Sequence, residues 1–191
     1  MSLERLFAEF LSQLVEFNIP TDLRPALEPH LKDTARRVCR MYENDLLSGY
    51  RMSPEDILKT DFKDGYDSIV IVRKIPFYSL CAHHMLPFFG MADVAYLPYG
   101  RVVGLSKLAR IVECFARRLQ IQEQMGEQVV QALVDNLQVK GAACILRAEH
   151  LCMGCRGVNK PGTETVTSSL RGVFRDLPEA RAEHMSLLGR N

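Results

Sequence analysis

The feature that most restricts the fold of this chain is the order in which its apolar patterns follow one another. Four segments have the β-branched or alternating character of strands: residues 68–75, 91–105, 143–151 and 165–174. The second of these is divided by a turn at residues 98–101. Two segments between the second and third carry apolar side chains at helical spacing: residues 107–118 and 123–137. This order of strand, strand, helix, helix, strand, strand predicts an α+β fold with an antiparallel sheet.

The part of the chain before this pattern is predicted to be helical. Residues 2–17 place apolar side chains on one helical face, and Pro20 ends that helix. A second helix begins near Asp33, whose side chain can cap it, and runs to about residue 49. These helices are expected to serve packing or an oligomer contact. We therefore expect two parts: a helical region over residues 1–65 and a domain that carries the chemistry over residues 66–191.

The charge balance excludes some classes of partner. Lys and Arg total 24 against 23 Asp and Glu, so the bulk charge indicates neither a nucleic-acid nor an anionic-membrane partner. The sequence contains no apolar run long enough to cross a bilayer, and its start lacks the basic-then-apolar layout of a secretory signal. We therefore expect a cytoplasmic protein. Its six cysteines are then expected to be buried apolar residues, metal ligands or nucleophiles rather than a disulfide framework.

Two short stretches concentrate the metal-ligating residue types. Cys81 and His84 lie three residues apart after a predicted strand, a spacing that lets both face one ion across a turn. The second stretch, residues 150–157, contains one histidine and two cysteines at a strand end. A catalytic zinc ion takes three protein ligands and one water, so Cys81, His84 and one cysteine of the second stretch would complete a set. The alternative is two unrelated patches at strand ends.

Two further histidines accompany these stretches. His83 follows Cys81 by two residues, and His150 precedes Cys152 by two, which on a strand points both side chains to one face. Imidazoles that lie beside a metal without binding it are suited to proton transfer near neutral pH. The alternative is that one or both support the ligands or lie on the surface.

An anion site is the third element that the sequence suggests. Ser106 and Lys107 stand at a predicted helix N-terminus, where free N–H groups and the helix dipole favour a phosphate. Arg110 lies one turn further along, and Arg156 lies beside the second cysteine stretch. Together these side chains could hold a polyphosphate. The alternative is an ordinary solvated basic face.

The motifs of the chain resemble those of GTP cyclohydrolase I. Five blocks appear in the order of that family: CAHHMLPF at residues 81–88, GLSKLARIV at 104–112, RRLQIQE at 117–123, HLCM at 150–153 and RGV at 156–158. The resemblance extends from about residue 34 to about residue 181 and is weakest over residues 50–75. It implies a tunnelling fold, in which antiparallel sheets of several subunits join side by side into a barrel. The barrels stack as a toroidal homodecamer, with active sites at subunit interfaces.

The resemblance also implies an activity and a metal. The expected reaction is the zinc-dependent opening of the imidazole ring of GTP, which gives 7,8-dihydroneopterin triphosphate and formate. Three positions match the family's zinc ligands: Cys81, His84 and Cys152. His83 and His150 match its two catalytic histidines.

The substrate contacts are carried over in the same way. Gln122 and Glu123 match residues that recognise the guanine edge, where a carboxylate suits the ring's N–H and amino donors. Three positions match triphosphate contacts: Lys107, Arg110 and Arg156. Ser106 lies with them and is counted with the catalytic residues. Arg37 matches a further phosphate-binding arginine in a looser neighbourhood.

The chain departs from the family pattern at one position and carries one unexpected thiol. Ala82 stands where the family block has glutamate, next to a ligand and a catalytic histidine, so a supporting group is lost. Cys155 forms a C-x-x-C pair with Cys152 that the family does not require, and we take it as incidental. The alternatives are a metal ligand or an oxidation-prone neighbour. The departure at position 82 leaves two further possibilities, a paralogue with another purine or pterin substrate and a non-catalytic metal-binding oligomer.

Overall fold

The computed structural model describes residues 2–59, 61–63 and 65–189. The chain divides into two compact units, Met1–Ser48 and Gly49–Asn191, so the segment between residues 49 and 65 packs with the second unit. The division into a helical region over 1–65 and a chemistry-bearing domain over 66–191 stays a prediction. None of the described helices is long and apolar enough to span a membrane.

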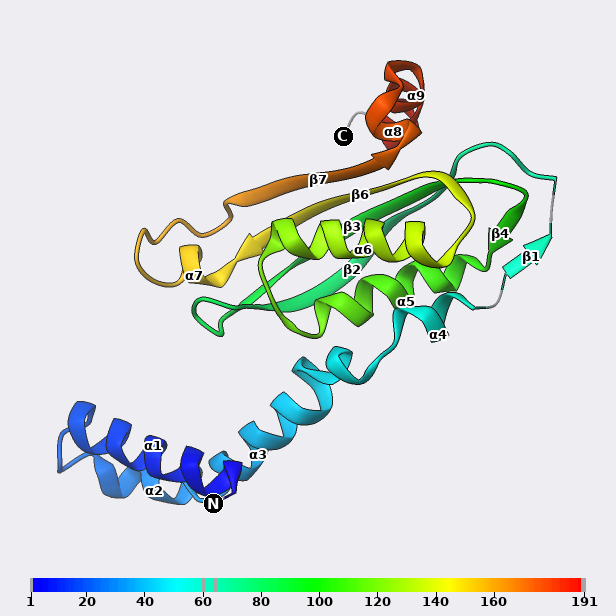
Figure 1. Cartoon of the computed structure of the whole chain (residues 1–191). Coiled ribbons are helices and arrows are strands. Elements are labelled where there is room, and N and C mark those ends of the chain that lie inside the picture. The colour runs from blue at the N-terminus through cyan, green and yellow to red at the C-terminus, as the bar shows by residue number, and fades with distance from the viewer. Residues whose placement is uncertain (1, 60, 64, 190–191) are drawn as a thin grey trace. The chain divides into compact units, whose positions relative to one another are not determined.

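The first unit is helical (Figure 1). It contains α1 (Leu3–Asn18), α2 (Arg24–Leu31) and α3 (Thr34–Met41), and α3 continues into a π-helical turn over Tyr42–Leu46. Ser2 caps α1 by accepting a hydrogen bond from the Arg5 backbone N–H at 3.3 Å. The sequence did not predict α2, because Pro29 lies inside it and a proline there removes a helical hydrogen bond.

Helix α1 leaves much of its apolar surface exposed within its own unit. It packs against α3, yet none of its described residues is buried. Five large apolar side chains are more than two-fifths exposed: Leu3, Leu6, Phe10, Leu14 and Phe17. A contiguous apolar stripe of this kind is typical of surfaces that take part in interactions.

The second unit is built on a five-stranded sheet in the order β5-β2-β3-β6-β7. Four long strands pair antiparallel: β2 (Val70–Cys81), β3 (Pro87–Pro98), β6 (Val139–His150) and β7 (Glu164–Gly172). The short β5 (Leu119–Gln120) runs parallel to the end of β2. A separate antiparallel pair joins β1 (Asp61–Lys63) to β4 (Arg101–Val103). The predicted α+β class with an antiparallel sheet is confirmed, and the segment 91–105 divides into β3 and β4 as expected.

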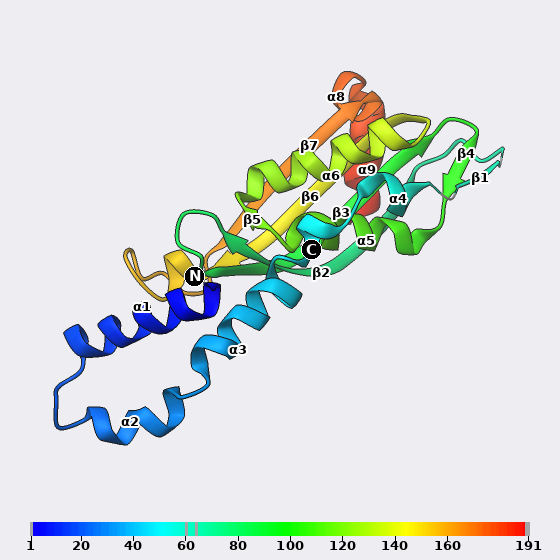
Figure 2. The ribbon, with the colours of Figure 1, turned by 60° about the horizontal axis from the view of Figure 1, so that its bottom comes forward.

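Two helices cover one face of this sheet (Figures 1 and 2). They are α5 (Leu105–Ala116) and α6 (Gln122–Asn136), and the short α4 (Pro54–Leu58) packs against both. The apolar faces predicted from helical spacing are buried as expected: Leu108, Ile111, Val112 and Phe115 on α5, and Val129, Val130, Leu133 and Leu137 on α6 and at its end. Each such side chain stabilises the fold by roughly 1.5–3 kcal/mol. This packing makes the sheet a rigid base for the residues at its ends.

The opposite face of the sheet holds a smaller core. The chain leaves β7 through α8 (Val173–Asp176) and α9 (Pro178–Leu188). Phe174 of α8 packs with Ala95 and Ala143, which alternate with residues of the main core along β3 and β6. His184 of α9 lies beside the Phe174 ring, with centroids 5.1 Å apart.

His184 is an unusual core residue, because its side chain is fully buried and neither ring nitrogen has a hydrogen-bond partner among the described residues. Burial lowers the pKa of this imidazole below its ordinary value of 6.5, and the negative charge of Asp93 opposes that shift. The unfolded chain therefore takes up the proton first as the pH falls. Stability from a neutral His184 is fully present above about pH 6.5 and is lost progressively as the pH falls from there through the lower pKa of the folded state.

We predict that His184→Met stabilises the protein and reduces its sensitivity to acid. A thioether fills similar space without a buried donor or acceptor, so the free energy of unfolding should rise by about 1 kcal/mol near neutral pH. The gain over wild type should grow as the pH falls from about 7.5 to about 5.5. Urea unfolding at both pH values measures this, and a gain that shrinks with acidification would contradict the prediction.

Candidate metal centre and active site

The first part of the site is the tight turn that follows β2. Cys81 is the last residue of that strand, and its carbonyl accepts hydrogen bonds from the backbone N–H groups of Met85 at 2.8 Å and His84 at 3.3 Å. The N–H of Cys81 in turn donates to the Leu86 carbonyl at 2.9 Å. The turn brings the Cys81 Sγ within 3.7 Å of the His84 Nδ1. Two ligands of one tetrahedral zinc ion are about 3.6 Å apart, so this pair fits the predicted spacing.

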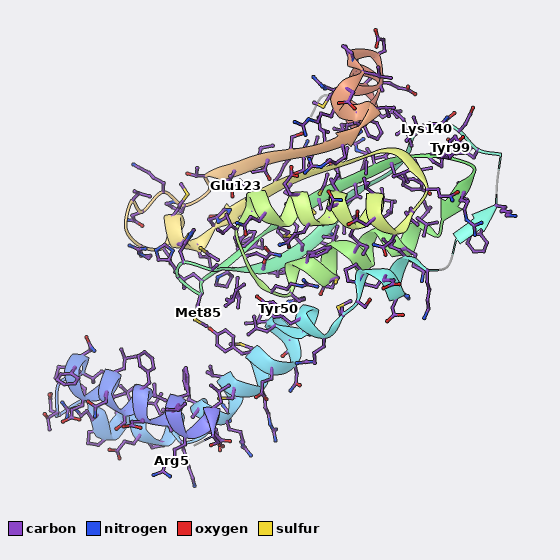
Figure 3. All side chains as sticks on the ribbon, viewed as in Figure 1. Arg5, Tyr50, Met85, Tyr99, Glu123 and Lys140 are labelled. Carbon is purple, nitrogen blue, oxygen red and sulfur yellow. The ribbon has the colours of Figure 1, made fainter. Side chains whose placement is uncertain are left out.

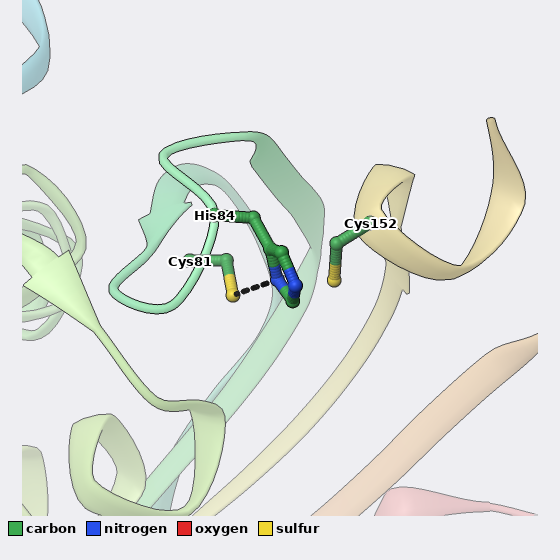
Figure 4. Close-up of side chains that lie close together, drawn as sticks. All are labelled: Cys81, His84 and Cys152. Carbon is green, nitrogen blue, oxygen red and sulfur yellow. Dashed lines mark hydrogen bonds between the residues drawn. The ribbon is translucent and has the colours of Figure 1, made fainter. Parts of the chain in front are cut away.

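The second part comes from the end of β6. The strand ends at His150, and the chain turns at once into α7 (Leu151–Gly154), which carries Cys152. Ligand atoms of Cys81, His84 and Cys152 all lie within 4.8 Å of one another. In Figure 4 the two cysteine side chains flank the ring of His84 and converge on one space. Among the described residues this is the only group of three such side chains, and two thiols with an imidazole are donors that suit zinc.

The electrostatics of the thiols favour a cation at this place. Burial raises the pKa of the Cys152 thiol, and the neighbouring Cys81 thiol raises it further. The Cys152 thiol therefore resists ionisation unless a positive charge lies beside it. A bound divalent cation reverses that balance and deprotonates a coordinating thiol. Cys155, at the end of α7, is exposed and is not part of the group.

His150 lies beside the thiols with its ring firmly held. The ring stacks on Phe88, the partner of His150 across β3 and β6, with centroids 4.6 Å apart and planes 1° apart. Its Nε2 lies 2.7 Å from the Oε1 of Gln122. Burial lowers the pKa of His150, and the negative charge of Glu123 opposes the shift. The ring is therefore neutral near neutral pH and can accept a proton.

A pocket of about 260 Å³ joins these groups. Its walls come from the turn after β2, from the link between β5 and α6, from the end of β6 with α7, and from Thr165 of β7. Glu123, the second residue of α6, presents an exposed carboxylate there. A larger cavity of about 570 Å³ lies around Asp93 and Arg147, but Cys81, His84 and Cys152 do not line it.

Comparison with known proteins decides what kind of chain this is. The family model described as GTP cyclohydrolase I matches residues 22–189. This chain belongs to the GTP cyclohydrolase I family.

Several relatives in this family are close in sequence. A protein named GTP cyclohydrolase 1 from Dehalococcoides mccartyi is 49% identical over 160 residues, which is 83% of this chain and 84% of the relative. Its namesake from Carboxydothermus hydrogenoformans is 48% identical over 83% of each chain. A crystal structure of the archaeosine synthase QueF-Like in the apo form covers 55% of this chain and 94% of its own. At 15% identity and a TM-score of 0.44, that likeness is too weak to support an argument.

The structure brings seven of the predicted site residues to the walls of one pocket. They are Cys81, His83, His84, Gln122, Glu123, His150 and Cys152. Arg156 follows α7 with an exposed side chain, and its charge is near enough to lower the pKa of Cys152. Ala82 is exposed in the turn, and its N–H donates to the Gln120 carbonyl at 2.9 Å. The positions that the family resemblance assigns to metal binding and base recognition thus lie together within one chain.

None of the predicted phosphate contacts on α5 lines the pocket. Ser106, Lys107 and Arg110 belong to the first half of α5, which begins just after β4. Figure 3 labels Met85 and Glu123 at the pocket end of the sheet and Tyr99, in the turn before β4, at the other end. The 12 residues of α5 span about 18 Å at the helical rise. Arg37 is exposed in the first unit, 4.0 Å from Asp33.

Sequence reasoning missed three residues that shape the pocket. Phe88 stacks on His150, while Thr165 and Thr167 accept hydrogen bonds from Gln122. Phe88 lies inside the CAHHMLPF block, and the two threonines alternate along β7. The sequence therefore contained a local pattern that included each of these residues. The residues that they contact, His150 and Gln122, could not be predicted, because they lie on segments far away in the sequence.

We predict that Cys152→Ser loses zinc whereas Cys155→Ser keeps it. Both cysteines stand in or beside the same helical turn, but only Cys152 belongs to the ligand group. Loss of a ligand should lower zinc affinity by more than the roughly 10–100-fold that loss of a supporting partner costs. Metal content after dialysis, measured by mass spectrometry, provides the comparison. If Cys155→Ser lost zinc and Cys152→Ser kept it, the thiol at position 155 would be the ligand instead.

Proposed function

We propose that this chain is a zinc-dependent GTP cyclohydrolase I, which opens the imidazole ring of GTP and gives 7,8-dihydroneopterin triphosphate and formate. The observation that carries the proposal is the group of Cys81, His84 and Cys152 beside a neutral, firmly held His150 in one pocket. The relatives named GTP cyclohydrolase 1 support the same reaction.

Zinc is the metal that the donor set fits best. Cys81, His84 and Cys152 would hold it, since two thiolates and one imidazole leave a fourth position open for catalysis. A bound zinc ion supplies Lewis acidity, which makes water a stronger nucleophile at neutral pH. All other steps fall to the side chains of the protein.

The histidines and Glu123 supply the remaining groups. His150 and His83 both line the pocket, where either can pass a proton to or from the purine ring as it opens. The exposed carboxylate of Glu123 can accept hydrogen bonds from the N–H and amino groups of guanine. Lys107, Arg110 and Arg156 are assigned to the triphosphate, with Ser106 beside them and Arg37 as a further contact.

We also propose the tunnelling-fold assembly, a toroidal homodecamer with active sites at subunit interfaces. Three observations support it. The start of α5, which carries the residues assigned to phosphate, follows β4, and Figure 3 shows Tyr99, in the turn before β4, at the end of the sheet away from the pocket. The pocket of about 260 Å³ lies at the small end of the roughly 300–1,000 Å³ of ordinary ligand sites, which is consistent with a further surface completing it. The apolar stripe of α1 also lacks a cover within its own unit.

We expect purified protein loaded with zinc to release formate and dihydroneopterin triphosphate from GTP, and the chelated protein to release neither. Fluorescence of the oxidised pterin and enzymatic assay of formate measure the two products. His83→Ala is the control that separates metal binding from proton transfer, since it should keep zinc and lose turnover.

The same assay decides how the alanine at position 82 matters. Its side chain is exposed in the turn and fills no space that a ligand needs, so we propose that the absence of glutamate changes the rate rather than the reaction. A folded, zinc-loaded oligomer without turnover would instead favour a paralogue with another purine or pterin substrate, or a non-catalytic metal-binding oligomer.

If each active site is shared between two subunits, two inactive variants should restore activity when they assemble into one oligomer. His83→Ala and Lys107→Ala should each be nearly inactive alone, because each removes one half of every site. Co-expressed in equal amounts, they should regain about a quarter of the wild-type sites, since each site draws its two halves from two chains. Specific activity of the purified mixed oligomer measures this.

A second pair of variants, both altered in the pocket, is the control for this recovery of activity. His83→Ala with His150→Ala should recover nothing, because both residues line the pocket of the same chain. Equal recovery from both pairs, or from neither, would contradict the proposed division of the site.

A further inference from the structure

Gln122 has an environment that its assigned contact with guanine does not explain. It is the first residue of α6 and borders the pocket, yet it is only 2% exposed. Its Nε2 lies 3.0 Å from the Thr165 carbonyl, 3.3 Å from the Leu146 carbonyl and 3.1 Å from the Thr167 hydroxyl. Its Oε1 lies 2.7 Å from the Nε2 of His150. Both ends of the amide are therefore already engaged by the protein.

The two carbonyls determine which way this amide points. A carbonyl oxygen can only accept a hydrogen bond, so the NH₂ group of Gln122 must face Leu146 and Thr165. The opposite orientation would set three acceptor oxygens against one another in a buried place. The Oε1 therefore faces His150 and accepts, and the Nε2 of His150 must carry the hydrogen.

That hydrogen bond decides the chemistry of the other ring nitrogen. A neutral imidazole has one N–H, so a hydrogen on Nε2 leaves a lone pair on Nδ1. Among the described residues Nδ1 has no hydrogen-bond partner, while the stack on Phe88 fixes the plane of the ring. His150, which lines the pocket, therefore carries one defined acceptor, its Nδ1.

We propose that Gln122 is a positioning residue, which fixes His150 as the Nε2–H tautomer so that Nδ1 is the nitrogen that exchanges a proton with the substrate. The proposal rests on the proposed function for the role of His150. Recognition of guanine then belongs to the neighbouring Glu123, whose exposed carboxylate is free to meet a ligand. For Gln122 to contact guanine, its amide would have to leave buried partners, each worth about 1 kcal/mol.

The tautomer can be observed without turnover. In zinc-loaded protein labelled with ¹⁵N-histidine, solid-state NMR should show the signals of His150, assigned by their loss in His150→Asn, with the hydrogen on Nε2. Gln122→Met removes every hydrogen bond of the amide and should shift these signals toward a mixture of tautomers. Thr167→Val removes only one acceptor of Gln122, so it should shift them less and serves if Gln122→Met does not fold.

Kinetics separate positioning from recognition. Gln122→Met should lower kcat at least about tenfold with KM nearly unchanged, because the base is misplaced while the guanine contact survives. Glu123→Gln is the matched control at the next residue, and it should raise KM and leave the His150 signals as in wild type.

Two results would overturn the proposal: an Nδ1–H tautomer in the wild-type protein, or a rise in KM without loss of kcat in Gln122→Met. Absence of wild-type turnover together with the expected Nε2–H signals and their shift in Gln122→Met would count against the proposed function, and the assigned tautomer would stand.

Discussion

The pairing of β3 with both β2 and β6 is the constraint on which the site depends. Its register sets Leu80 opposite Pro87 and Phe88 opposite His150, so the turn after β2 and the helical turn of α7 leave the same end of the sheet. Because side chains alternate between the faces of a strand, a slip of one residue would turn His150 to the opposite face and away from Phe88. The candidate metal ligands and the proposed base are therefore held by the backbone hydrogen bonds of the sheet as well as by the turns that carry them.

The core under the sheet supports the same geometry. Helix α6 begins in the pocket at Gln122, and Met125 and Val129 anchor its following turns with no exposed surface. Strand β5 pairs Gln120 with Cys81, so the chain enters α6 at a fixed distance from the ligand turn. Polar groups in a partly desolvated pocket keep their geometry only when packing locks the elements that carry them. Here the apolar core provides that locking.

One chain supplies two separated halves of the proposed site. The thiols, the histidines and Glu123 lie at one end of the sheet, and the α5 residues assigned to phosphate lie at the other. A rigid sheet cannot bring its own two ends together, whereas neighbouring copies can place unlike ends side by side. The proposed ring of subunits would bring such unlike ends together.

Local patterns alone were sufficient to predict much of this protein. The helical spacing of residues 107–118 and 123–137, the strand segments and the pairing of Cys81 with His84 depend on residues close in sequence, and the structure shows them as expected. The family's motifs indicated Cys152 as the third ligand, whereas residue spacing by itself left open which cysteine joins Cys81 and His84.

Only the tertiary structure decided that Cys152 lies with Cys81 and His84 while Cys155 does not. It also buried the amide of Gln122 against β6 and β7, and it placed the start of α5 away from the pocket. Helix α2 formed around a proline that local rules count against a helix. The physical reason is common to these cases: burial and hydrogen-bond partners depend on the register and packing of distant segments, which no local spacing encodes.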